Sequence, residues 1–482
     1  MKAKTYHQRH AVLEDSATPA PKVNGLYSDE GTDTQLLGLL RRYKRKGKPV
    51  SVNFRRILPA LKAGDRLTHL LHPYPAKLLA HIPVFFLSNN ILSTPGDTVL
   101  DPFCGSGTVL LEAQVAGRNA LGVDANPLAR LIAEVKTRVL EASSLNRCLD
   151  GVLTRIKAAP TGDSPDVVNL KHWFYPGVAR QLQCLGKAIE CMRNPQMRDF
   201  FRVCFSVCVR KVSLADPRLS VPVRLKAASY PKQHPLREKS ARHLRGLRRV
   251  RVRDVFEQVA RTNIVRMEKL RATGAHGVSE IVCSDARDLK YEFSLNGKRD
   301  KAIADASVQL IVTSPPYPGA QKYIRSCSLS LGWLGLCPTA DLRAYKSRTI
   351  GREEFTKTEY DQITRTNVAE ADDSLARIRR RSPVRAAIAA AYLNEMRVAI
   401  KEMHRVLKPG GHLVLVAANN RIAGKKFQTV KYLETIAKQS GLRLDACFID
   451  AIKSRGLMTK RNGTASVITR EWVLLFTKGG SS

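Results

Sequence analysis

The segment at residues 311–319, IVTSPPYPG, combines residue types that could hold a flat ring carrying an amine. Prolines remove backbone donors and fix φ, so the strand-like residues before Ser314 must end there. Ser314 and the carbonyl after it can then accept hydrogen bonds from an exocyclic amine, and the ring of Tyr317 can stack on a planar base. Pro315 and Pro316 keep this turn rigid, so little ordering entropy is lost on binding. A plain structural turn is the alternative interpretation.

A second segment, DPFCGSGT at residues 101–108, follows a short apolar run and precedes a helical pattern. Gly105 and Gly107 allow a tight turn and the close approach of a ligand to the backbone. The segment lacks both the GxGxxG spacing of a dinucleotide site and the Lys of a phosphate-binding loop. Asp101, directly before the loop, also argues against a pyrophosphate. It favours a positive or neutral group, such as the ammonium of an amino acid.

Two further acids end predicted strands. Asp124 ends NALGVD, where an acid at the end of a second strand hydrogen-bonds ribose hydroxyls. Asp285 ends IVCSD, a third strand, and can reach an adenine amino group. Each acid alone could equally be a helix cap or a turn residue. Together with Asp101 they predict a site for S-adenosylmethionine, and the turn at Ser314 would direct an amine lone pair at its sulfonium methyl group.

The charge balance predicts a polyanionic partner. The chain of 482 residues has 80 Lys and Arg against 42 Asp and Glu, a formal net charge of +38. Cations that bind phosphates release condensed counterions, which favours nucleic acid. A charge that serves only solubility is the alternative. A base in a duplex would have to be flipped out of the stack to reach the turn.

Other bulk properties exclude several classes of protein. The ten cysteines include no CxxC pair, so buried free thiols in a reducing compartment are expected and a zinc site is not. No apolar run has the length that spans a bilayer. The first 16 residues lack the apolar stretch of a secretory signal, so we expect a cytoplasmic protein.

Alternating strand and helix patterns predict an α/β fold. Residues 98–102 and the NALGVD run read as strands on either side of the helical pattern TVLLEAQVAG, which is a right-handed βαβ unit. About seven strands can be counted, so we predict a doubly wound, mostly parallel, Rossmann-like sheet with an inserted, mainly helical basic domain. The predicted parts are a basic N-terminal arm at 1–66, a first catalytic part at 67–160, an inserted target-recognition region at 161–275 and a second catalytic part at 276–482.

DPFCGSGT and TSPPY together resemble the amino-methyltransferases that modify exocyclic amines of DNA bases, cytosine N4 and adenine N6. Ser-Pro-Pro-Tyr is more typical of the cytosine-N4 enzymes, whereas adenine-N6 enzymes carry Asp or Asn first. HPYPAKL at 72–78 resembles the segment that covers the cofactor's methionine end, and MHRVLKPGGHLVLV at 403–416 resembles the fifth-strand region. The resemblance implies S-adenosyl-L-methionine as cofactor, double-stranded DNA as substrate, and restriction-modification or phage defence as the setting, with a cognate endonuclease as a candidate partner.

The resemblance also assigns roles to single residues. The catalytic turn would comprise Ser314, Pro315, Pro316 and Tyr317. The cofactor site would comprise His72, Pro73, Lys77, Asp101, Phe103, Cys104, Gly105, Gly107, Thr108, Asp124, Ala125, Asp285 and Ala286. Cys104 is no nucleophile in this scheme, because attack by an amine needs no covalent adduct, and no metal is expected.

Arginine-rich stretches are the candidates for contacts with phosphates, with a solvated surface as the alternative. The predicted contacts are Arg245, Arg248, Arg249, Arg251, Arg253, Arg379, Arg380, Arg381 and Arg455. Two other functions stay open. An RNA base-amine methyltransferase could use the same pocket, and a nucleic-acid-binding protein could carry the pocket in an inactive form.

The position of the insertion departs from the family's pattern. The large segment between the glycine loop and Ser-Pro-Pro-Tyr falls before IVCSD, whereas the family's order places it after that strand. Either Asp285 is not the adenine contact, or the recognition region is placed unusually.

Overall fold

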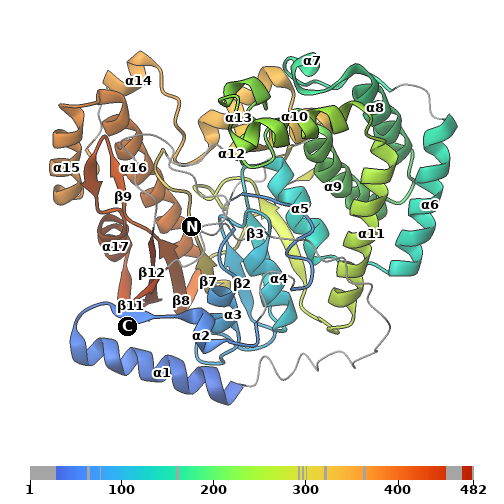
Figure 1. Cartoon of the computed structure of the whole chain (residues 1–482). Coiled ribbons are helices and arrows are strands. Elements are labelled where there is room, and N and C mark those ends of the chain that lie inside the picture. The colour runs from blue at the N-terminus through green and yellow to red at the C-terminus, as the bar shows by residue number, and fades with distance from the viewer. Residues whose placement is uncertain are drawn as a thin grey trace.

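The computed structural model describes residues 29–61, 66–75, 77–158, 162–290, 294–295, 298–299, 301–319, 323–361, 365–451 and 469–479. Its main strands are β1 (Val50–Val52), β2 (Thr98–Asp101), β3 (Asn119–Val123), β4 (Ser279–Cys283), β7 (Val308–Thr313), β8 (Leu407–Ala417), β11 (Leu442–Ala451) and β12 (Arg470–Lys478). They form one sheet in the order β1-β11-β12-β8-β7-β2-β3-β4 (Figure 1). Within this described sheet, β12 alone runs antiparallel to its neighbours. The predicted doubly wound, mostly parallel sheet is confirmed, with one strand more than expected.

Alternate residues of the central strands face two different cores. Val99 of β2 packs with α3 (His81–Leu87) and α4 (Thr108–Val115), whereas its neighbour Leu100 packs with α16 (Pro383–Val406) and α17 (Thr429–Gln439). Parallel strands that are covered on both faces are apolar throughout, which explains the VLD and LIVT runs of β2 and β7. The parallel strands therefore end together at one edge, here named the carboxyl edge.

The N-terminal described residues belong to the sheet domain. α1 (Asp29–Lys46) leads into β1, which pairs in parallel with β11, and α2 (Phe54–Ile57) follows. Leu36 and Phe54 are fully buried in the same core as α3. Residues 29–61 are thus folded onto the sheet, in contrast to the arm expected for 1–66, because the buried apolar side chains of α1 and β1 suffice to anchor an otherwise basic segment.

A helical region lies between β3 and β4. After α5 (Pro127–Thr137) it contains α6 (Ala142–Ala158), α7 (Leu170–Trp173), α8 (Pro176–Glu190), α9 (Pro195–Val212), α10 (Pro235–Arg248) and α11 (Val252–Arg271). Apart from α10, these helices share one core with α5, and together they form the lobe on the right of Figure 1. Since β3 and β4 are adjacent and parallel, the insertion leaves and re-enters the sheet at neighbouring strands.

The remaining elements surround the carboxyl edge. They are the helices α12 (Tyr323–Trp333), α13 (Leu342–Arg348), α14 (Lys357–Asp361) and α15 (Ala369–Arg379), and the short hairpins β5 (Ser294–Leu295) with β6 (Lys298–Arg299) and β9 (Asn420–Ile422) with β10 (Lys425–Phe427). Among the described helices, none combines the length and the apolar character needed to cross a bilayer.

Candidate active site

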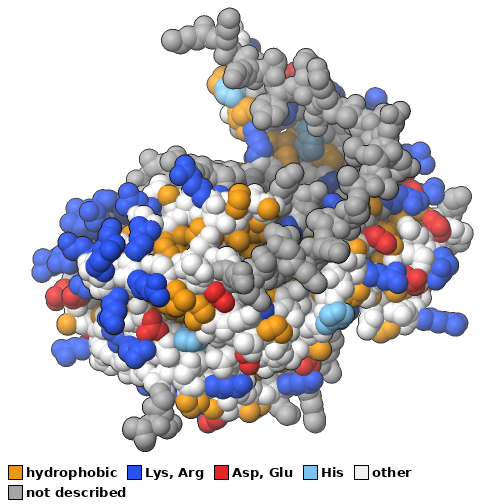
Figure 2. Space-filling view, turned by 90° about the horizontal axis from the view of Figure 1, so that it is seen from below, with side chains coloured by type: hydrophobic (Ala, Val, Ile, Leu, Met, Phe, Trp, Pro, Cys, Tyr) orange, Lys and Arg blue, Asp and Glu red, His pale blue; other side chains and the backbone are white. Residues whose placement is uncertain are grey.

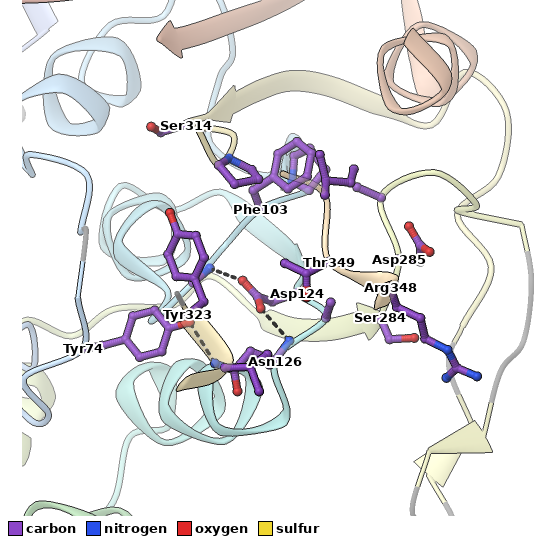
Figure 3. A pocket seen from close by; sticks show the side chains of 17 residues that line it. Tyr74, Phe103, Asp124, Asn126, Ser284, Asp285, Ser314, Tyr323, Arg348 and Thr349 are labelled. Carbon is purple, nitrogen blue, oxygen red and sulfur yellow. Dashed lines mark hydrogen bonds between the residues drawn. The ribbon is translucent and has the colours of Figure 1, made fainter. Parts of the chain in front are cut away.

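A cavity lies at the carboxyl edge (Figure 3). Its walls come from the residues that follow β2, β3, β4 and β7, together with Tyr74 and two segments near α12 and α13. The lining residues are Tyr74, Pro102, Phe103, Gly105, Asp124, Ala125, Asn126, Ser284, Asp285, Ala286, Ser314, Pro316, Tyr323, Ile324, Arg348, Thr349 and Ile350. A mostly apolar lining with a few convergent polar groups is typical of small-molecule sites.

The glycine loop after β2 forms the floor of the cavity. Gly105 lines it and has a φ of 50°, and Gly107 has a φ of 73° at the N-terminus of α4. A Cβ on Gly107 would lie 2.9 Å from the Cβ of Ala133 on α5. Only glycine therefore permits both the left-handed turn and the close packing of α5 beneath it.

Asp124 occupies the centre of the cavity, directly after β3 (Figure 3). Its Oδ2 accepts the backbone N–H of Gly105 at 2.9 Å, and its Oδ1 accepts that of Asn126 at 2.8 Å. Burial raises the pKa of this carboxyl to about 6, against the two N–H donors that lower it. Each carboxylate oxygen has further lone-pair capacity, which suits a ligand that presents hydroxyl donors.

Asp285 stands at the far end of the cavity, two residues after β4 (Figure 3). Arg287 binds its carboxylate through Nη2 to Oδ2 at 2.7 Å and Nε to Oδ1 at 3.0 Å. Arg348 lies on the same side of the cavity in Figure 3, and Thr349 lies closer to Asp124. Asp285 thus shares the cavity with Asp124 even though the insertion precedes β4, and its contact with adenine stays a prediction.

The turn after β7 completes the cavity. Ser314 and Pro316 line it, whereas Pro315 is buried and Tyr317 is half-buried beside it. Gly319 donates its N–H to the carbonyl of Gly351 at 3.2 Å, which ties the turn to the segment that carries Arg348 and Thr349. Burial raises the pKa of Tyr317 well above its usual value, so its ring stays a neutral phenol.

Comparison with known proteins shows that this chain is similar to DNA methyltransferases. Residues 72–134, which hold the glycine loop and Asp124, match the model of the N6/N4 methyltransferases, described as DNA methylase. The type II methyltransferase M.MvaI of Kocuria varians is 23% identical over 421 residues, 83% of this chain and 87% of that protein. These matches relate the chain to the N4/N6 family of DNA amino-methyltransferases. A second relative, M.MjaII of Methanocaldococcus jannaschii, is 36% identical over 96 residues, 20% of this chain and 18% of that protein.

Two solved structures with detectable similarity are also methyltransferases. One is an S-adenosylmethionine-dependent methyltransferase of Methanosarcina mazei, with 12% identity, coverage of 81% of this chain and 96% of that chain, and a TM-score of 0.28. Another is an rRNA methyltransferase of Streptomyces viridochromogenes, with 10% identity, coverage of 88% and 96%, and a TM-score of 0.30.

S-adenosyl-L-methionine is the cofactor that the sequence predicts, and the residues of the cavity fit it. Asp124 offers acceptors for ribose hydroxyls at the centre of the cavity, and Asp285 offers a carboxylate at one end. A Cβ on Gly105 would lie 3.6 Å from Cε1 of Tyr74, so the absence of a side chain there keeps the floor open.

Several of the residues that the sequence predicts to bind the cofactor lie outside the cavity wall of this chain. Asp101 is buried, and its Oδ1 accepts the hydroxyl of Thr313 at 2.6 Å and the N–H of Phe103 at 3.1 Å. Burial raises the pKa of Asp101 to about 7 and that of the Cys104 thiol well above its usual value. Thr108 is buried in the first turn of α4. These residues shape the loop from behind, and their direct contact with the cofactor stays a prediction.

The HPYPAKL segment contributes one side chain to the cavity. His72 is buried with its Nε2 2.9 Å from Oγ of Ser206, and Pro73 is exposed. Lys77 donates to the carbonyl of His72 at 2.6 Å, which curls the segment so that Tyr74 enters the cavity. The hydroxyl of Tyr74 accepts Nδ2 of Asn126 at 3.1 Å.

Sequence reasoning missed part of the cavity wall. Tyr74 lies within the HPYPAKL motif, although the resemblance gives the role to its neighbours. Arg348, Thr349 and Ile350 belong to no motif and reach the cavity only through the turn that follows α13. The hydrogen bond between Gly319 and Gly351 holds this segment beside the catalytic turn. No local pattern in the sequence predicts that bond.

The predicted phosphate contacts divide into two groups. In the insertion, Arg249 is exposed, Arg245 pairs with Glu238, Arg251 pairs with Asp254, Arg248 lies over the ring of Tyr175, and Arg253 is half-buried. Arg379, Arg380 and Arg381 are exposed between α15 and α16. Arg455 lies outside the described residues.

Proposed function

We propose that the chain transfers a methyl group from S-adenosylmethionine to the exocyclic N4 amine of cytosine in double-stranded DNA. The observation that carries the proposal is the position of Ser314, directly after the central strand β7 and in the same cavity as Asp124 and Asp285. An acceptor at that point can hold the hydrogens of an amine beside the cofactor site. The enzyme acts on a base that has left the duplex, because an amine inside the base stack cannot reach the turn after β7.

Catalysis in this scheme is mostly positioning. The bound cofactor supplies an electrophilic methyl group on a sulfonium centre. Ser314 Oγ and the backbone carbonyl of Pro315 accept the two amine hydrogens and turn the nitrogen lone pair toward that methyl group. Tyr317 stacks on the base, and the two prolines keep the acceptors in place before the base arrives. As the nitrogen–carbon bond forms and the sulfur–carbon bond breaks, the amine gives up one proton through these hydrogen bonds to water.

The residue at the first position of the motif supports cytosine over adenine. A Ser hydroxyl can donate as well as accept, whereas the Asp or Asn typical of the adenine-N6 enzymes offers a stronger or larger acceptor. Cytosine also presents a smaller ring to a turn whose tyrosine is half-buried. Adenine N6 remains the second outcome that the same pocket chemistry allows.

The setting we propose is restriction-modification. The relatives M.MvaI and M.MjaII are named type II methyltransferases, which fits a site-specific enzyme in a bacterial or archaeal cytoplasm with a cognate endonuclease. The insertion, residues 161–275, is the proposed target-recognition region. Its helix α10 presents exposed arginines on the lobe that flanks the carboxyl edge.

Nucleoside mass spectrometry tests the proposal. Mixed-sequence duplex DNA and, separately, total RNA are incubated with the protein and methyl-deuterated S-adenosylmethionine and then digested. Labelled 4-methylcytosine from DNA is the expected product. Labelled 6-methyladenine would keep the mechanism and overturn the choice of base. Label in RNA alone, or none with either polymer, would refute DNA methylation by this chain.

A further inference from the structure

The hairpin of β9 and β10 projects from the end of β8 at the carboxyl edge. Its two turn residues, Ala423 and Gly424, have φ values of 48° and 78°, as a tight two-residue hairpin requires. Ile422 and Phe427 are buried and anchor the hairpin to the core beneath α16 and α17. The hairpin therefore has a fixed position, although it is short.

The exposed side chains of this hairpin are all cationic. Arg421, Lys425 and Lys426 are exposed, and Lys426 lies directly opposite Arg421 in the antiparallel pair. Opposed residues in such a pair have Cβ atoms about 4.5–5.5 Å apart, and like charges there destabilise the hairpin. Arg421 donates Nη2 to the carbonyl of Gly424 at 2.6 Å, but in the part of the chain that is described neither cation has a carboxylate partner. An anion between them would relieve the repulsion.

More cations connect the hairpin to the catalytic turn. A Cβ on Gly424 would lie 3.5 Å from Nη1 of Arg381, and a Cβ on Gly319 would lie 3.4 Å from Nη1 of Arg385. Gly319 comes two residues after Tyr317. We name this set the cationic surface, and its members are Arg379, Arg380, Arg381, Arg385, Arg421, Lys425 and Lys426.

The cations of the cationic surface differ from others on the same helices. Elsewhere on α16 and α17, Arg405 pairs with Glu402 at 2.8 Å, Lys431 with Glu370 at 2.7 Å and Lys438 with Glu434 at 2.7 Å. No member of the cationic surface makes such an ion pair with any residue that the structure describes. Unpaired cations beside a pocket for a nucleic-acid base indicate a phosphate-binding surface.

We propose that the cationic surface binds the DNA phosphates that flank the extruded base, with Arg421 and Lys426 holding one phosphate between them. The inference rests on the proposed function, and it adds the residues that bind the DNA strand on either side of the extruded base. Arg385, beside Gly319, would contact the phosphate nearest the target base. The arginines of α10 would then meet the duplex from the other lobe (Figure 1).

A second basic region of the chain provides a matched control. Arg45, Lys46 and Lys48 are exposed at the C-terminal end of α1. Because α1 ends just before β1, which runs parallel to β11, this end lies at the edge of the sheet opposite the carboxyl edge. Figure 2 looks onto the face where α1 lies and shows Lys and Arg side chains gathered at its left, the side on which α1 ends in Figure 1.

The experiment compares the triple variant R421Q/K425Q/K426Q with R45Q/K46Q/K48Q in the full chain. The affinity for a fluorescent duplex is measured by anisotropy over a range of salt concentrations, and the affinity for S-adenosylmethionine by calorimetry. For each phosphate that the variant no longer neutralises, we expect the slope of log K against log [salt] to fall by about 0.9 and the affinity near 0.15 M salt to fall about fivefold. The hairpin variant should show this weakening with unchanged cofactor affinity, and the α1 variant should match wild type.

Other outcomes would overturn the inference in distinguishable ways. Equal weakening in both variants would mean that only net charge matters. An unchanged slope in the hairpin variant, while wild type still methylates duplex DNA, would refute the cationic surface and leave the proposed function intact. Weaker binding to RNA but not to DNA would refute the choice of partner. If wild type neither binds nor labels duplex DNA, both the surface and the proposed function fail.

Discussion

Arg287 joins Asp285 to two other parts of the active site. Besides its hydrogen bonds to that carboxylate, its guanidinium donates to the carbonyl of Arg348 at 2.9 Å and to Oε1 of Glu395 on α16 at 3.3 Å. Asp285 and Arg348 both line the cavity. Arg287 thus connects two parts of the cavity wall, at Asp285 and at Arg348, to α16.

Replacing Arg287 by Gln should weaken cofactor binding. The variant lacks the charge-assisted bonds that orient Asp285 and hold the carbonyl of Arg348, each worth roughly 1.5–3 kcal/mol. We expect the Kd for S-adenosylmethionine to rise about tenfold or more in calorimetry. Arg405→Gln is the matched control, because Arg405 makes equivalent bonds to Glu402 and to the carbonyl of Ile303, outside the cavity wall. A Kd that rises equally in both variants would show that the effect is only one of stability.

Cofactor affinity should fall in mild acid. The pKa of Asp124 is about 6, so its carboxylate is charged at neutral pH and becomes protonated below that value. Ribose hydroxyls bind the charged form better, so the affinity should decrease by about tenfold for each pH unit below 6. Asp124→Asn should bind more weakly at pH 8 and show no such slope. An equally steep slope in the Asn variant would assign the titration to another group.

The free energy of unfolding should depend on Asp101 in a different pH range. Its pKa is raised to about 7 by burial, so the stability that the neutral carboxyl contributes is present at low pH and is lost as the pH rises through 7. Asp101→Asn keeps an oxygen that can accept from Thr313 and Phe103 without the buried charge. In urea unfolding without cofactor, we expect this variant to be more stable than wild type at pH 8, by on the order of 4 kcal/mol, and the difference to shrink as the pH falls from 7 to about 4, the usual pKa of an aspartate. A lower stability at pH 8 would contradict the assignment.

Tyr317→Ala should impair base capture without changing cofactor affinity. Stacking of a base on an aromatic ring is worth roughly 1–3 kcal/mol, so KM for duplex DNA should rise about fivefold to a hundredfold. Tyr317→Phe keeps the ring and should retain most of the activity. Because Tyr317 is not part of the cavity wall in the structure, calorimetry with S-adenosylmethionine should give the same Kd for all three proteins. A decrease in the cofactor affinity of Tyr317→Ala that matches its loss of base capture would contradict the stacking role of Tyr317.

Gly107→Ala should destabilise the protein by more than its backbone conformation alone requires. A left-handed φ costs a non-glycine residue about 1–2 kcal/mol. At Gly107 the added Cβ also collides with Ala133, which adds roughly 1–3 kcal/mol. Gly47 has a similar φ of 61° and no atom within 4 Å of an added Cβ, so Gly47→Ala isolates the backbone cost. Equal urea midpoints for the two variants would show that α5 can move away from the loop.

The local patterns of the sequence located most of the fold and the centre of the site. The strands around Asp124, Asp285 and Ser314 are apolar runs that end in recognisable turns, so their alternation with helices could be read directly. Parallel strands share a carboxyl edge, and for that reason the three side chains converge on one cavity. The same reasoning could not give the direction of each side chain. Asp101 accepts a hydrogen bond from Thr313 instead of lining the cavity. Thr313 lies on β7, which is adjacent to β2 in the sheet but distant in the sequence, so local patterns could not show this contact.

The parts that local patterns do not show depend on contacts between distant residues. β1 has only three residues in a basic segment, and it becomes a strand because β11 offers an open parallel edge. Arg348 reaches the cavity through Arg287 and through the bond between Gly319 and Gly351. Like the opposed cations Arg421 and Lys426, these relationships exist only once the sheet has formed.

The pairing of β1 with β11 also affects how the protein is made. Val50 aligns with Phe448, so β1 waits for a partner strand that is synthesised about 400 residues later. At roughly 5–20 residues per second, that delay is about 20–80 s. During this time the apolar face of α1 has no strand to cover. Nascent chains should therefore need protection by a chaperone until β11 has been synthesised.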